Sequence, residues 1–197
     1  TLHLGMSDAR NKFVQTSGFE SRRTSEQYLR GRWNALPALS LEGNLTRGQR
    51  SSDSEFFNNK DYDILYWELG PDMTFIPTRD FRASLAYTFR EDGDQLPESG
   101  TYAQRHTLEA EARYNRSAKT SVQLRLSVVS VNFDGQPNSP VGFAILNGLQ
   151  RGDNYLWNLT LDQQLSGSIQ LRVSYEGRKT GTARVVHTGR AQVAANF

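Results

Sequence analysis

Three histidines and one acidic loop are the residues of this chain that could carry out hydrolysis. His3, His106 and His187 are its only histidines, and a hydrolase needs a histidine close to a serine or a carboxylate. His106 follows by a few residues a segment that contains such groups, namely Glu91, Asp92, Asp94, Glu98 and Ser99. An acidic, solvated loop explains these residue types more simply, because isolated types are weak indicators of catalysis. We therefore expect no enzyme and no catalytic residues.

The sequence Asp92-Gly93-Asp94 is similar to the first three residues of a calcium-binding loop. An EF-hand loop also needs an oxygen ligand at its fifth position and a glutamate at its twelfth. Counted from Asp92, those positions hold Leu96 and Ala103, so the pattern fails at both. The sequence contains no cysteine, which removes thiol catalysis and cysteine-ligated zinc. We expect no metal and no cofactor.

Charged residues recur at every second position of several segments, opposite apolar ones. In a β-barrel the polar side of such a strand faces inward, where opposite charges pair and fill a narrow lumen. In a wider barrel the same side chains could select ions or substrates. The charges that we expect in the lumen are Arg82, Glu109, Glu111, Arg113, Arg125, Arg172, Arg184 and Arg190.

Strands that would position these charges are predicted by the period-2 alternation of apolar and polar residues. Segments 155–165 and 169–176 alternate in this way, and the short link 166–168 contains a glycine, which indicates an antiparallel hairpin. The same pattern repeats upstream, over 29–33, 39–45, 65–75, 81–90, 108–114 and 122–128. With a short first strand over 1–6, these segments predict about ten strands.

The connections between these strands alternate between short turns and longer polar segments. The longer ones are 7–24, 48–60, 91–101 and 132–152, and only 177–182 is of middling length. Bacterial outer-membrane barrels have short periplasmic turns and long extracellular loops, whereas a soluble sandwich mixes both at each end. Segment 132–152 is too apolar for a free loop. We expect it to fold over the barrel mouth or to dock on a partner.

Composition excludes several other classes of protein. The chain has 197 residues, 37% of them hydrophobic, with a mean hydropathy of −0.63, and no apolar run approaches the roughly 18 residues of a transmembrane helix. Its 23 basic and 21 acidic residues give a net charge of +2, which argues against a nucleic-acid partner. Thr1 is neither an initiator methionine nor the start of a signal peptide, so we expect a processed chain or a fragment.

The last fifteen residues, from Ala183, read as one strand with an apolar and a polar side, which is typical of a membrane-spanning β-strand. The tail 184–197 resembles the last strand of Gram-negative outer-membrane β-barrel proteins, whose terminal aromatic residue helps the barrel-assembly machinery to recognise them. The stretch 155–179 resembles C-terminal regions of large surface barrels in Bacteroidota-type bacteria. By this resemblance Phe197, together with Val193, is expected to be an assembly signal.

These patterns predict an all-β protein, an antiparallel up-and-down transmembrane β-barrel of about ten strands. Residues 1–197 would form a single barrel domain or the C-terminal part of a larger barrel. We expect it in the bacterial outer membrane, as a structural component or one of transport or secretion. The expected partners are outer-membrane lipid, the barrel-assembly machinery and other proteins of a larger membrane complex.

Two alternatives stay open at the level of sequence. A soluble extracellular β-sandwich or barrel that binds a protein or a glycan predicts Greek-key pairing between strands that are not neighbours in sequence. An outer-membrane hydrolase predicts that His106 or His3 lies within hydrogen-bonding distance of an acidic residue and a serine.

Overall fold

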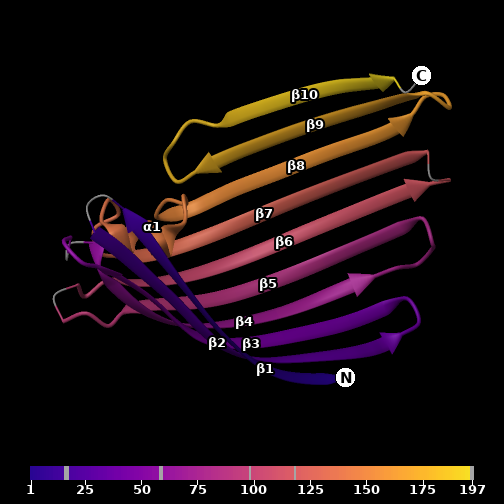
Figure 1. Cartoon of the computed structure of the whole chain (residues 1–197). Coiled ribbons are helices and arrows are strands. Elements are labelled where there is room, and N and C mark those ends of the chain that lie inside the picture. Colours follow the sequence, from indigo (N-terminus) through magenta and orange to yellow (C-terminus); the bar gives the residue numbers. More distant parts are fainter. Residues whose placement is uncertain (16–17, 58–59, 98, 118, 196–197) are drawn as a thin grey trace.

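The computed structural model describes residues 1–15, 18–57, 60–97, 99–117 and 119–195. Ten β-strands form one antiparallel sheet in which each strand pairs with its neighbours in sequence (Figure 1). The elements are β1 (Leu2–Gln15), β2 (Gly18–Leu36), β3 (Leu39–Ser54), β4 (Tyr62–Phe75), β5 (Phe81–Asp94), β6 (Tyr102–Arg116), β7 (Thr120–Asp134), α1 (Pro140–Leu146), β8 (Gly152–Gln164), β9 (Ile169–Thr180) and β10 (Val186–Ala195). The predicted strand number and up-and-down order are confirmed. The Greek-key pairing of the sandwich alternative does not occur among these strands.

The sheet is curved but open. β1 and β10 are its two edges, and no pairing joins them within the described ranges; Figure 1 shows them far apart. An unpaired edge exposes backbone N–H and C=O groups, each of which costs several kcal/mol in hydrocarbon. Inside a membrane such an edge has to be paired, either with the opposite edge of the sheet or with further strands.

The first strands are much longer than the sequence pattern predicts. The prediction of a loop over 7–24 is wrong, because β1 and β2 pair continuously from Leu2–Gly31 to Gln15–Gly18. β3 likewise continues to Ser54. Polar residues occupy both faces of these extensions, so they lack the apolar alternation that marks a strand.

One face of the sheet is apolar although it is exposed, and we call it the outward face. Leu85, Leu108 and Leu126 point to it and are 43%, 48% and 46% exposed. A continuous apolar surface of this extent is rare on soluble monomers. On β5 the outward residues are apolar from Phe81 to Phe89, close to the roughly 9–11 residues with which a tilted strand crosses a bilayer. No helix in the described ranges is long and apolar enough to cross a membrane.

The apolar band on the outward face ends along one row of the sheet. The strand register aligns the outward residues Met6, Gln27, Arg47, Trp67, Glu91 and Gln104 across β1 to β6. Beyond this row β1, β2 and β3 present polar side chains such as Asp8, Arg23 and Gln49. Trp67 donates its indole N–H to Glu91 on the row itself, which is typical of a membrane–water interface. The first strands therefore extend past the apolar band.

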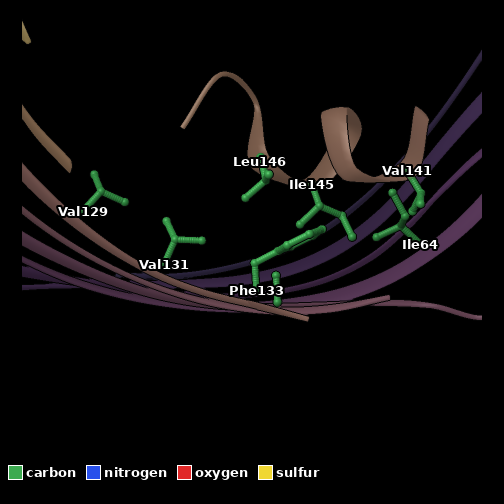
Figure 2. Close-up of a cluster of buried hydrophobic side chains, with 8 residues drawn as sticks. Ile64, Val129, Val131, Phe133, Val141, Ile145 and Leu146 are labelled. Carbon is green, nitrogen blue, oxygen red and sulfur yellow. The ribbon is translucent and has the colours of Figure 1, made fainter. Parts of the chain in front are cut away.

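The buried core lies on the opposite, concave face, which we call the inward face, beneath α1 (Figure 2). The helix begins after Ser139, whose hydroxyl accepts a hydrogen bond from the Gly142 N–H at 3.1 Å, and it ends at the left-handed Asn147. Its Val141, Ile145 and Leu146 pack with residues from β4, β6 and β7, namely Ile64, Ala103, Val129, Val131 and Phe133. Segment 132–152 was expected to fold over the barrel mouth or to dock on a partner; in the structure its helix packs on the inward face of the sheet itself.

Candidate functional site

The inward face carries the charged residues that the alternation predicts. The register places Arg82 opposite Arg113, and Ser84 opposite Glu111. It also places Glu111 opposite Arg125 on the next strand. Arg172 and Arg190 belong to the same face on β9 and β10, since Arg172 lies opposite Asp162 and Arg190 opposite Ser174. The strands therefore gather these side chains on one wall.

Several of these charges form ion pairs along the wall. Arg125 donates to Glu111 at 2.7 Å and lies 3.7 Å from Glu109, and Arg172 donates to Asp162. These arginine side chains are half exposed, at 50% and 58%. Ion pairs in such positions are worth at most about 1 kcal/mol each. They order the charges of the wall more than they stabilise the sheet.

A more buried charge cluster lies nearer to α1 and was not predicted as a site. Arg90 donates to both carboxylate oxygens of Asp92 at 2.7–3.0 Å and to Glu68 at 3.4 Å. Its guanidinium carbon lies 3.8 Å from the centre of the Tyr66 ring, and the Tyr66 hydroxyl donates to Glu26. Arg90 belongs to the polar side of the strand predicted over 81–90. Asp92 was placed in the predicted loop 91–101, but β5 continues to Asp94 and so includes it.

α1 also contacts Arg50, whose guanidinium carbon lies 5.8 Å from the centre of the Tyr66 ring in this cluster. Arg50 donates to the carbonyl oxygen of Ala144, in the last turn of the helix, at 3.3 Å. A cation at this end of a helix satisfies a free carbonyl and complements the helix dipole. The helix therefore covers part of the inward wall, at the end of the strands away from both termini (Figure 1).

One of the predicted site residues, Arg184, lies outside the strands. β10 begins at Val186, so the prediction that a strand includes Arg184 is wrong. A turn at the left-handed Gly181, with a hydrogen bond from Ala183 to Thr180, precedes this residue and delays the strand. Phe197 lies outside the described residues. Val193, the other residue of the expected assembly signal, is on the outward face and is 68% exposed.

The histidines at positions 106 and 187 lie on the outward face in similar surroundings. Nδ1 of His106 is 2.7 Å from the Tyr87 hydroxyl, and Nδ1 of His187 is 2.7 Å from the Tyr175 hydroxyl. The hydrolase alternative instead requires an acidic residue and a serine beside His106 or His3, and among the described residues neither histidine has such a hydrogen bond. No group of three His, Cys, Asp or Glu side chains in the described ranges could hold a metal ion.

Comparison with known structures finds outer-membrane barrels. A loop L8 deletion mutant of OmpT, an outer membrane protein of Vibrio cholerae, aligns with 95% of this chain at 10% identity and a TM-score of 0.56. OmpT itself aligns with 88% at 10% identity and a TM-score of 0.55. The chain spans only 62% and 54% of these two proteins. No family model and no curated protein matches the sequence.

The translocator domain of the autotransporter NalP from Neisseria meningitidis aligns with 98% of this chain and 72% of its own length. The identity is 12%, but the TM-score of 0.48 is too low to support an argument. The agreement with OmpT concerns the fold alone. Together with the sequential strand order and the exposed apolar band, it defines the class: the chain has the fold of an outer-membrane β-barrel, present here as an open sheet of ten strands.

Proposed function

We propose that the chain is one sector of an outer-membrane β-barrel with more than ten strands, and that the inward face lines a water-filled pore for polar solutes. The observation that carries this proposal is the position of α1 on the concave face of an open sheet. A closed barrel of eight strands has an interior that side chains alone fill. Ten strands leave little more room, so the paired charges and a helix together favour a wider barrel.

In a wide barrel the inward charges contact water and passing solutes rather than filling a dry interior. Charged side chains that line a channel determine which ions enter it. The proposed role is therefore passive transport, with α1 narrowing the passage. We assign no catalytic residue, metal or cofactor to this role, and we propose no nucleic-acid partner.

The pore is tested by the conductance of the full-length protein in planar lipid bilayers. We expect stable steps of current whose size rises with salt concentration, because a water-filled pore conducts ions in proportion to their number. A heat-denatured sample of the same preparation serves as the control. A folded, membrane-inserted protein that gives no current steps would contradict the pore and leave a structural role for the barrel.

The proposed partners during assembly are outer-membrane lipid and the barrel-assembly machinery, with Phe197 and Val193 as the signal. Likeness to large surface barrels of Bacteroidota-type bacteria, and a place in a larger membrane complex, belong to the same proposal. Its basis is the apolar alternation of β10, on which Val193 points outward opposite Leu171.

Removal of Phe197 is expected to lower the amount of assembled protein in the outer membrane several-fold. Assembly is measured as the fraction that resists trypsin and migrates differently on gels before and after boiling. Phe197→Trp is the matched control, because it keeps a terminal aromatic residue. Equal assembly of the shortened and unchanged proteins would show that recognition does not use this residue.

A further inference from the structure

Two arginines face each other on the inward wall without a neutralising partner. Arg82 on β5 and Arg113 on β6 are directly opposite in the register, and both are exposed. Like charges in this position repel each other and destabilise a sheet. Among the described residues, no ion pair or hydrogen bond involves either guanidinium.

The carboxylates nearest to this pair are mostly engaged elsewhere. Glu111 accepts hydrogen bonds from Arg125 at 2.7 Å and from Gln123 at 3.0 Å, and Asp162 accepts one from Arg172. Asp80, two residues before Arg82, forms no ion pair among the described residues, and its single charge can balance only one of Arg82 and Arg113. The turn between β6 and β7 adds one further cation, Lys119. This end of the wall therefore has an excess of positive charge.

A groove opens on the inward face beside Arg113. It has a volume of about 420 Å³, and its polar lining includes two cations, Arg113 and Lys119, and one carboxylate, Asp162. Asp162 is paired with Arg172, so the two cations are not neutralised by it. The groove lies at the end of the sheet that carries the turns after β6 and β8 (Figure 1). In an outer-membrane barrel with short periplasmic turns, this is the periplasmic mouth.

We propose that this groove, together with the Arg82–Arg113 pair, binds small anions that carry phosphate or sulfate groups. Guanidinium groups present a planar fork of donors that matches the oxygens of such anions, and an anion between two arginines removes their repulsion. This inference rests on the proposed pore function. It adds that the periplasmic mouth of the pore favours the entry of anionic solutes. The electric field of a cluster of positive charges raises the local concentration of anions.

The test measures binding of inorganic pyrophosphate to the full-length protein in detergent by calorimetry at low ionic strength. The Arg82→Gln/Arg113→Gln variant is expected to bind about tenfold more weakly, because it loses the charge-assisted hydrogen bonds. The control is Arg10→Gln/Arg47→Gln, which removes the same charge from the outward face and should bind normally. The single variants Arg82→Gln and Arg113→Gln are measured as well. They keep the site testable if the double variant does not fold.

The same variants are compared in bilayers under a gradient of potassium chloride. The preference for chloride over potassium should fall at least threefold in the Arg82→Gln/Arg113→Gln variant and stay constant in the control. Unchanged pyrophosphate binding, or equal weakening in both double variants, overturns the anion site. If the wild-type protein gives no current, the pore proposal fails, whereas pyrophosphate binding still decides the anion site.

Discussion

Removal of α1 is expected to raise the single-channel conductance about twofold or more. The change replaces residues 136–150 by a short glycine-serine linker, which is feasible because Val131 and Gly152 are paired across the ends of β7 and β8. A helix with its side chains is about 10–12 Å across, so its loss frees a large part of the lumen cross-section. Current steps in planar bilayers measure the effect.

A point variant tests whether conductance depends on the position of α1 rather than on the length of the segment that contains it. Ile145 is 5% exposed and packs in the core beneath the helix. Ile145→Asp places a charge in that core without shortening the chain, and burial of an unpaired charge is strongly unfavourable. We expect higher conductance and rapid proteolysis within 136–150. Phe143→Asp is the control, because Phe143 is on the same helix but 64% exposed. A conductance that neither the deletion nor Ile145→Asp changes would show that α1 lies outside the path of ions.

The sequence predicts the outward face well because hydrocarbon demands apolar side chains at every second position. The alternation of β5 to β9 follows from this requirement, and the register confirms it residue by residue. Beyond the apolar band the requirement disappears. Asp8 and Arg23, hydrogen-bonded at 3.0–3.1 Å, belong to strands there, although their sequence is that of a polar loop. The strands were therefore predicted where they contact the membrane and missed where they extend past it.

The inward site was predicted only in part, because alternation gives the face of a residue but not its partners. It identifies Arg113 and Glu111 as inward, yet only the register shows Arg113 opposite another arginine and Glu111 opposite Arg125. The apolar content of 132–152 indicates that this segment is covered. Its docking on the inward face involves Arg50, Ile64 and Ala103, which are distant in sequence. Contacts between distant segments carry no periodic signal.

A single arginine on either side of β7 should distinguish the two faces of the sheet. Leu126 points outward within the apolar band and is 46% exposed, whereas Ser127 points inward opposite Glu109. An arginine on the lipid face near the middle of a bilayer costs about 2–4 kcal/mol. Leu126→Arg should therefore lower stability by that amount and reduce the membrane-inserted fraction, as measured by urea unfolding in lipid vesicles and by heat-modifiable migration on gels.

Ser127→Arg should leave both quantities nearly unchanged, because its guanidinium would contact water and the Glu109 carboxylate. The two variants together show whether the outward face, the inward face or neither face contacts lipid. The reverse outcome would mean that the two faces are exchanged, so that Arg82, Arg113 and α1 face lipid and the lumen assignments fail. Equal tolerance of both arginines would mean that neither face contacts hydrocarbon, which would contradict the membrane barrel itself. A large loss of stability for Leu126→Arg with none for Ser127→Arg would show that the outward face contacts lipid. Only the inward face could then line a pore.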